Sequence, residues 1–456
     1  MNSRRNFLKM SAAATSAPLL SGLAKAQSTP GAAVAGKAPP SDPDSWQLDP
    51  TLGAPVIPAD WWSVWPYSKW TFSHVSESTR TATVWRGPGP VLPLPQRLRN
   101  MAGLEIAFGG GRRATLREFL EKDYTDGFLI LHRGEIVFET YMNGMEPHFK
   151  HIGRSVTKCV TGTMVGILVG KGLIDPESLV TRYLPEVQAT AYRGATVQQL
   201  LDMTAGATVR GENELYVPHT DMYNYLIASG YIGSEGHPEA PADVWQAILR
   251  ITEQNAPHGA RYEYHDAHID LLGFIMQRVS GKFLPELFSS ELWGPMGAEE
   301  DACQMVDKSR FALSSGGFQA TLRDWARFAL LHLRRGKLNG RQIVPSKWID
   351  DTRAANDHLF QLQLHTEDPD SVTRAYHNGC RIYDRKRRDY GHTGSYGQFL
   401  YMDPQSDFAA VKLSHWPDAA EVQLLQRPDR QVTKPLFGSY RDTFAAIRAI
   451  RDELAK

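Results

Sequence analysis

The pattern of hydrophobic and polar positions predicts two β-hairpins far apart in the chain. In the first, Phe128-Leu129-Ile130-Leu131 and Ile136-Val137-Phe138 flank Arg133-Gly134, a pair typical of a tight turn. In the second, strand-like runs at 398–401 and 408–413 flank a segment rich in turn-forming residues. We therefore expect a sheet that draws strands from both ends of one domain.

Between the hairpins the pattern becomes helical. Residues 156–171 are apolar nearly all round and stop at Gly172, which is typical of a buried helix. Further helices are predicted at 197–203 after Thr196, at 244–252, at 267–279 ending in Ser280-Gly281, and at 322–335 ending in Gly336. A sheet built from both ends with helices inserted between them is an α+β arrangement.

The first residues predict an export signal. Arg4-Arg5 precedes an apolar run at 12–23 and then Ala24-Lys25-Ala26, the pattern of a twin-arginine signal cleaved after Ala26. The run is too short for a bilayer-spanning helix, which needs about 20 residues, so we expect no stable membrane anchor. The twin-arginine export machinery would then deliver the protein to the periplasm or beyond it. A disordered basic N-terminus is the alternative.

The 456 residues fit one large domain or two intimate ones. We expect a signal peptide at 1–26, a linker rich in Ala, Pro, Gly and Ser at 27–58, and a folded domain at 59–456. Fifty basic residues balance fifty acidic ones, and no basic block indicates a nucleic-acid partner. Three cysteines without metal-ligand spacing predict ordinary thiols rather than a disulfide framework.

Ser155-Val156-Thr157-Lys158 opens the predicted buried helix. A spacing of three places the hydroxyl and the amine on one face of the first turn. Serine becomes nucleophilic when a base removes its proton, and lysine serves as that base if burial or a helix N-terminus lowers its pKa. The motif therefore predicts a catalytic pair, and the alternative is a capping serine beside a solvated lysine.

Two other segments carry candidate chemistry. Tyr264 stands just before a predicted helix, where a phenol near a cationic lysine can shuttle protons, although Asp266 could simply cap that helix with Tyr264 packed beside it. Gly391-His392-Thr393-Gly394-Ser395 leads into the second hairpin, and its glycines allow a backbone to approach a ligand and hold an oxyanion. A plain loop before a strand is the alternative.

Taken in order, the three segments resemble the motifs of the serine β-lactamase and penicillin-binding superfamily. Ser155 and Lys158 match its Ser-x-x-Lys, Tyr264-His265-Asp266 its Tyr-x-Asn, and His392-Thr393-Gly394 its Lys-Thr-Gly. Within that class C-like superfamily the chain looks most similar to the 6-aminohexanoate-dimer hydrolase group. That closer resemblance rests on Ser155 to Lys158 and on the runs YRGATV at 192–197, LLDMT at 200–204 and YMDP at 401–404.

The resemblance implies a fold, a mechanism and site residues. The fold would be α+β and β-lactamase/transpeptidase-like, an antiparallel sheet flanked by helices, with an α/β lobe at about 100–175 and 313–456 and an all-helical insertion lobe at about 176–312. Ser155 would form an acyl-enzyme, with Lys158 and Tyr264 relaying protons. The backbone amides of Ser155 and Ser395 would form the oxyanion hole. The substrate would be a small amide or ester, with no cofactor and no metal.

Two positions depart from the superfamily pattern. Asp266 stands where β-lactam-recognising members have Asn, and a carboxylate cannot donate the amide hydrogen bond. His392 replaces Lys, so the usual anchor for a substrate carboxylate is neutral or only partly charged near pH 7. With Thr393 and Gly394, these two residues are the predicted substrate-binding set. Both departures argue against a dedicated β-lactamase.

Several alternatives stay open on the sequence alone. Carboxylesterase and β-lactamase or D-peptidase-like activities are the nearest, and a non-catalytic penicillin-binding-like module is another. A metallohydrolase built on His265 and His268, with Asp266 or Asp270, is a third. In the 6-aminohexanoate-dimer hydrolase group a mobile loop supplies a substrate-contacting tyrosine, for which Tyr223 and Tyr225 are the candidates.

Overall fold

A computed structural model describes residues 62–63, 65–211, 217–234, 237–363, 371–417 and 436–456. The predicted signal peptide at 1–26 and the linker at 27–58 lie outside these residues. No helix within the described ranges is both long and apolar enough to span a membrane.

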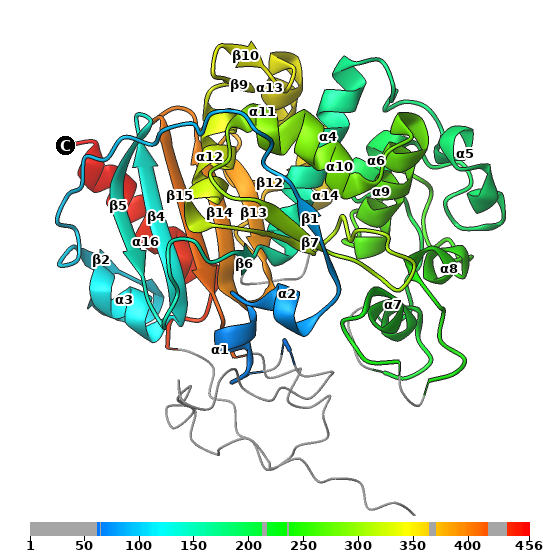
Figure 1. The fold of residues 1–456 in the computed structure, drawn as a ribbon, viewed down its shortest axis with the longest axis horizontal. Helices are drawn as coiled ribbons and strands as arrows, with labels where there is room; N and C mark the ends of the chain where they lie inside the picture. The colour runs from blue at the N-terminus through cyan, green and yellow to red at the C-terminus, as the bar shows by residue number, and fades with distance from the viewer. Residues whose placement is uncertain (1–61, 64, 212–216, 235–236, 364–370, 418–435) are drawn as a thin grey trace, which may run out of the picture. The chain divides into compact units, whose positions relative to one another are not determined.

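A seven-stranded antiparallel sheet forms the centre of the α/β part, in the order β11-β12-β13-β14-β15-β4-β5 (Figure 1). Its strands are β4 (Thr125–His132), β5 (Glu135–Tyr141), β11 (Ala375–His377), β12 (Cys380–Ile382), β13 (Tyr390–Gly394), β14 (Gln398–Asp403) and β15 (Phe408–Ser414). Both predicted hairpins are confirmed, as β4–β5 and β14–β15. Pairing of β15 with β4 joins them, with Val411 opposite Leu129.

The sheet is buried on both faces. Along β4, Leu129 and Leu131 belong to one hydrophobic cluster, and the alternating Phe128 and Ile130 belong to a second. This is the two-residue period of a strand with apolar partners on each side. On the first face pack α4 (Thr157–Gly170), α12 (Leu322–Leu333) and α13 (Ser346–Ala354), and on the second α3 (Leu116–Lys122) and α16 (Tyr440–Leu454).

Smaller sheets complete the strand inventory. A four-stranded sheet runs β1-β7-β8-β6, and two-stranded ribbons pair β2 with β3 and β9 with β10. Their bounds are β1 (Thr81–Val84), β2 (Glu105–Ala107), β3 (Arg113–Thr115), β6 (His151–Ile152), β7 (Ala302–Met305), β8 (Phe318–Ala320), β9 (Lys337–Leu338) and β10 (Arg341–Gln342).

The segment between α4 and β7 is helical, as Figure 1 shows in green. It contains α5 (Val180–Tyr183), α6 (Val197–Leu201), α7 (Asp221–Ser229), α8 (Val244–Leu249), α9 (Asp266–Ser280), α10 (Leu284–Phe288) and α11 (Gly294–Met296). The segment also contains the short helices η4 (Pro185–Ala189) and η5 (Ser289–Trp293). Outside it lie α1 (Ser68–Thr71), α2 (Val75–Ser78) and α14 (Asp357–Gln363), and the single-turn helices η2 (Gly109–Gly111), η3 (Arg154–Val156) and η6 (Ser395–Gly397).

Local signals explain several helix ends. Thr196 caps α6 through a reciprocal pair with Gln199, and Gly281 ends α9 in the left-handed conformation that glycine tolerates. The predicted end of α12 at Gly336 is wrong by about one turn, because the helix already stops at Leu333. Cys159, Cys303 and Cys380 are free thiols, and all three are buried.

Helix α4 carries Lys158, follows the turn that holds Ser155, and is enclosed nearly all round. Every residue from Thr157 to Leu168 is buried, which confirms the prediction from its uniform apolar pattern. Two glycines permit the close packing. A Cβ at Gly162 would lie 2.0 Å from the carbonyl oxygen of Asn378, and one at Gly166 would lie 2.3 Å from the Trp348 ring. The helix is therefore fixed directly against the β11–β12 turn and α13.

Candidate active site

Ser155 and Lys158 meet as the spacing predicts. Ser155 lies in η3, the single turn that leads into α4, and is partly exposed within buried surroundings. Lys158 Nζ donates hydrogen bonds to Ser155 Oγ at 3.0 Å and to the carbonyl oxygen of Ser315 at 2.7 Å. It also forms an ion pair with Asp266 Oδ1 at 2.6 Å. The fully buried ammonium thus has three oxygen partners for its three hydrogens.

The sequence left the protonation of Lys158 open, and its surroundings raise its pKa rather than lower it. Burial alone would lower it, but the charge of Asp266 and the phenol of Tyr264 act in the opposite direction and raise the pKa above its ordinary value. Asp266 does not cap the helix. His265 is the N-cap residue of α9, and Asp266 is its first helical residue, with its carboxylate directed at Lys158. In the resting state Lys158 is a cation.

Tyr264 lies near two cations. Its ring centroid is 4.8 Å from Lys158 Nζ and 5.0 Å from the Arg381 guanidinium carbon. Tyr262 lies two residues before Tyr264 and packs on Tyr376, with the two ring centroids 5.9 Å apart. Tyr264 is therefore the better placed of the two for a proton relay with Lys158.

His392 is buried in β13, where its Nδ1 lies 2.6 Å from the Thr393 carbonyl oxygen and its Nε2 lies 3.3 Å from the Tyr376 hydroxyl. Burial, followed by the charges of Arg381 and Lys158, lowers the pKa of His392 well below its ordinary value. The imidazole is therefore neutral near pH 7. It cannot replace the charge of the Lys that the superfamily pattern has at this position.

The end of β13 lies beside the turn that holds Ser155. A Cβ at Gly394 would lie 2.5 Å from the carbonyl oxygen of Gly153, so only glycine fits there without displacement. Tyr440 donates a hydrogen bond to the Gly394 carbonyl from α16, at 2.8 Å. Ser395, the next residue, is exposed. This packing brings the backbone of Ser395 to the same edge of the site as Ser155.

With this geometry established, comparison with known proteins decides the family. A family model described as Beta-lactamase matches residues 113–433, which is more than half of the chain. The chain belongs to the β-lactamase family. It is a hydrolase of that superfamily with an antiparallel α+β fold of the β-lactamase/transpeptidase type.

Relatives of this β-lactamase-family chain include hydrolases of small molecules. It is 30% identical over 374 residues to the 6-aminohexanoate-dimer hydrolase of Paenarthrobacter ureafaciens, across 80% of this chain and 89% of that protein. A solved Bacillus anthracis structure, provisionally named as a 6-aminohexanoate-dimer hydrolase, superposes with a TM-score of 0.72 at 27% identity. It covers 81% of this chain and 95% of its own.

A more distant match shows the fold alone. The penicillin-binding protein homologue of Pyrococcus abyssi superposes with a TM-score of 0.52 at 16% identity, across 75% of this chain and 76% of that one.

The role of Asp270 in this β-lactamase-family site was not predicted from the sequence, which offered the residue as a candidate metal ligand. Asp270 is fully buried on α9 and accepts hydrogen bonds from the amides of Ser314 and Ser315 at 2.6 and 3.0 Å, and from the Ser315 hydroxyl at 3.0 Å. Burial raises its pKa to about 7. Asp270 thereby holds the carbonyl to which Lys158 donates. The sequence offered one clue to this role, because Asp270 lies four residues after Asp266 and so on the same face of the helix.

The remaining sequence candidates lie elsewhere or serve other contacts. Tyr225 is buried and donates a hydrogen bond to Asp270, whereas Tyr223 lies 3.0 Å from His237 Nε2. The rings of His265 and His268 are 5.0 Å apart. Across the described residues, no three or more His, Cys, Asp or Glu side chains are grouped as metal ligands. The metallohydrolase alternative therefore has no ligand set in the described chain.

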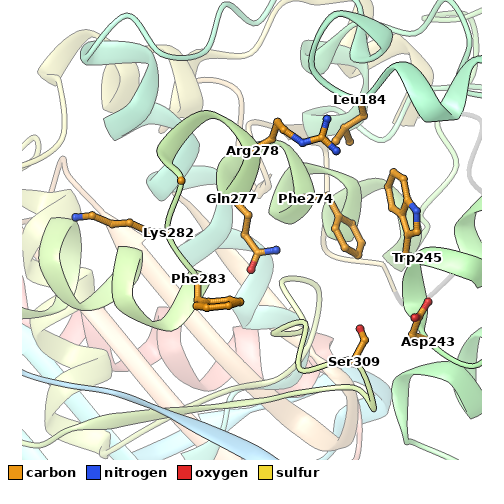
Figure 2. A pocket seen from close by; sticks show the side chains of 10 residues that line it. Leu184, Asp243, Trp245, Phe274, Gln277, Arg278, Lys282, Phe283 and Ser309 are labelled. Atoms are coloured by element: carbon orange, nitrogen blue, oxygen red, sulfur yellow. The ribbon is translucent and has the colours of Figure 1, made fainter. Parts of the chain in front are cut away.

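A separate hollow of about 600 Å³ lies in the helical segment (Figure 2). It is lined by Leu184, Asp243, Trp245, Phe274, Gln277, Arg278, Gly281, Lys282, Phe283 and Ser309. None of the residues around Ser155 belongs to this lining.

Proposed function

We propose that the protein hydrolyses small amides or esters through an acyl-enzyme on Ser155. The observation that carries the proposal is the 3.0 Å hydrogen bond from the fully buried Lys158 ammonium to Ser155 Oγ. A base for Ser155 must lie within hydrogen-bond reach of its hydroxyl, and Lys158 meets this condition while it is shielded from bulk water. The 30% identity to the Paenarthrobacter ureafaciens hydrolase supports a small amide as substrate.

The proton path follows from the contacts of Lys158. At rest Asp266, the partner of Lys158 at 2.6 Å, keeps it protonated, and an ammonium has no lone pair. Lys158 must therefore give up one proton, to Asp266 or to water, before it acts as a base. The neutral amine then accepts the proton of Ser155 Oγ as the oxygen attacks the substrate carbonyl, and the backbone amides of Ser155 and Ser395 hold the oxyanion. Lys158, assisted by Tyr264, returns the proton to the leaving amine or alkoxide. Water, deprotonated along the same path, then releases the acyl group.

The test is intact-protein mass spectrometry after treatment with a fluorophosphonate probe. We expect one adduct on the wild type, none on Ser155→Ala, and one on the control Ser78→Ala, a serine remote from the site. An unlabelled wild type, or a labelled Ser155→Ala, contradicts the acyl-enzyme mechanism and favours a non-catalytic module.

The substrate class is tested by measuring, side by side, the rates of hydrolysis of a linear 6-aminohexanoate dimer, a short-chain nitrophenyl ester and a chromogenic cephalosporin. We expect the cephalosporin to be the poorest substrate, because His392 is neutral where the superfamily pattern has a cationic anchor. Fastest turnover of the cephalosporin would favour the β-lactamase alternative. Fastest turnover of the ester would favour a carboxylesterase.

We also propose export by the twin-arginine route, supported by Arg4-Arg5 before the apolar run at 12–23. Cell fractionation of the wild type and of a variant with lysine at both positions tests this. Equal periplasmic amounts of the two proteins would contradict it.

A further inference from the structure

Arg154, immediately before the proposed nucleophile, has its guanidinium inside a cage of four aromatic rings. Its guanidinium carbon lies 4.8, 5.1, 5.3 and 4.5 Å from the ring centroids of Trp62, Phe72, Tyr231 and Tyr396 respectively, which we call the aromatic cage. These rings come from three distant parts of the chain, because Trp62 and Phe72 lie in the same segment. Tyr396 follows Ser395, so the cage lies at the proposed oxyanion hole.

Among the described residues, the guanidinium has no anionic partner. The residue is only 7% exposed, and its Nε is buried without a hydrogen-bond acceptor. Within the described residues, its other two nitrogens also form neither a hydrogen bond nor an ion pair, and the side chain is held by cation–π contacts. Such contacts contribute about 0.5–2 kcal/mol each, but a buried charge ordinarily also has a paired anion. The cage thus holds a cation whose hydrogen-bond donors are unused.

The backbone has an unusual conformation at Arg154 and at one residue of the aromatic cage. Arg154 has φ +47°, and Tyr396 in the cage has φ +64°, both in the left-handed region that side-chain-bearing residues seldom adopt. Strain of this kind persists where the surroundings hold it, often at ligand sites. Here it directs the Arg154 side chain to the aromatic cage from the residue adjacent to Ser155.

Other charges near the site have partners. Lys158 is paired with Asp266, and Arg381 donates to the Thr373 hydroxyl at 2.9 Å while it stacks on Tyr264, although the Nε of Arg381 is buried without an acceptor. His392 is neutral. Among the described side chains, Arg154 is a cation next to Ser155 that forms neither a hydrogen bond nor an ion pair.

We propose that Arg154 binds the carboxylate of the substrate, so that the preferred substrates are amides or esters that carry a negative charge. This inference rests on the proposed hydrolase function and specifies its substrate class. The planar fork of a guanidinium matches a carboxylate through two parallel hydrogen bonds, and exclusion of water by the aromatic cage strengthens them.

The test uses two matched substrate pairs, one with the charge in the acyl group and one with it in the leaving group. The first pair is the mono-4-nitrophenyl ester of adipate and its neutral adipamate analogue. The second is 4-(butyryloxy)benzoate and 4-(butyryloxy)benzamide. In at least one pair we expect wild type to favour the carboxylate in kcat/KM, and Arg154→Met to reduce that carboxylate-to-amide ratio about tenfold or more.

The controls separate the possible failures. Arg448→Met removes an arginine that stacks on Phe444 in α16, on the other face of the sheet, and should leave the ratio at its wild-type value. Arg154→Lys should retain part of the preference. If Arg154→Met is labelled by the fluorophosphonate but keeps the wild-type carboxylate-to-amide ratio of kcat/KM, the assignment of Arg154 alone is overturned. If the wild type is not labelled, the proposed function is overturned.

A measurement on the wild type covers the case in which Arg154→Met does not fold. Competitive inhibition by hexanoate is compared with inhibition by hexanamide at pH 7.5, where the acid is ionised. We expect hexanoate to bind about tenfold more tightly or better. Equal inhibition constants, or a preference for the amide, would contradict the proposal.

Discussion

The charge state of Lys158 depends on one neighbouring carboxylate. Lys158 is fully buried, and burial favours the neutral amine, yet Asp266 at 2.6 Å holds the proton on it. The superfamily pattern has an uncharged Asn at this position. A single oxygen-for-nitrogen difference at residue 266 therefore changes the resting state of the proposed base.

Asp266→Asn is expected to move the acid limb of the pH profile of kcat/KM to lower pH by about one unit or more. Removal of the carboxylate leaves burial to lower the pKa of Lys158, so the neutral, proton-accepting form exists at lower pH. The measurement is a pH–rate profile with a nitrophenyl ester. Asp350→Asn, which alters a carboxylate paired with Arg335 away from the site, is the control. An acid limb that stays in place or moves upward contradicts this role for Asp266.

At the residue scale, the sequence predicted some roles and missed others for a physical reason. Ser155, Lys158 and Tyr264 lie in short motifs, and the structure brings them together. The aromatic cage of Arg154 could not be predicted, because its rings come from positions 62, 72, 231 and 396 and share no local pattern. Neither could the direction of the Asp266 side chain, since a carboxylate at a helix start serves equally as a cap or as a partner.

At the scale of elements, glycines rather than high helix propensity determine how closely helix α4 packs against its neighbours. Gly162 would rank as a poor helix residue, but it allows the backbone of Asn378 to approach α4 more closely than any other residue could. The same turn carries Gly379, whose amide donates to the Leu201 carbonyl of α6 at 2.9 Å. Contacts of the β11–β12 turn therefore fix α4 and α6 together.

Gly162→Ala is expected to destabilise the protein by about 2 kcal/mol, although alanine favours a helix by nearly 1 kcal/mol. The added Cβ would lie 2.0 Å from a backbone carbonyl, so the helix or the turn must shift. Thermal unfolding measures the change. Gly103→Ala, where nothing lies within 4 Å of the added atom, is the control and should differ little from wild type. Higher stability of Gly162→Ala would contradict the packing described here.

The elements themselves were largely predictable. Strand-like runs that flank turn-forming residues identified both hairpins, and a uniformly apolar run identified α4. The small sheet β1-β7-β8-β6 was not predicted, because its strands are only two to four residues long and none shows a persistent period. Short strands are defined by their partners, which a single sequence does not reveal.

At the scale of the molecule, His377 links the helical segment to the sheet. Its Nδ1 lies 2.7 Å from Asp202, just after α6, and its Nε2 lies 3.1 Å from Asp351 on α13. Burial opposes the charged form, but the two carboxylates outweigh burial and raise the pKa of His377 to about 10. The imidazolium therefore bridges two parts of the fold.

Stability is expected to fall as pH rises from about 6.5 to about 10. A group whose folded pKa is raised stabilises the fold fully below its unfolded pKa and loses that contribution as pH passes the folded value. Unfolding in urea across this range should show a loss of about 2 kcal/mol in the wild type and a smaller one in His377→Gln. His148→Gln, an exposed histidine, should follow the wild type. If the free energy of unfolding depends on pH in the same way in the wild type and in His377→Gln, the bridging role of His377 is contradicted.

The pairing of β4 with β15 also has a consequence for the order of folding. Leu129 finds its partner Val411 only after the helical segment and most of the remaining chain exist, so the central sheet closes through contacts of very large sequence separation. Loop-closure entropy makes such contacts slow to form. Until β15 arrives, one edge of β4 presents unpaired backbone groups that invite association with other chains. A chain truncated before residue 408 would therefore aggregate rather than retain a partial fold.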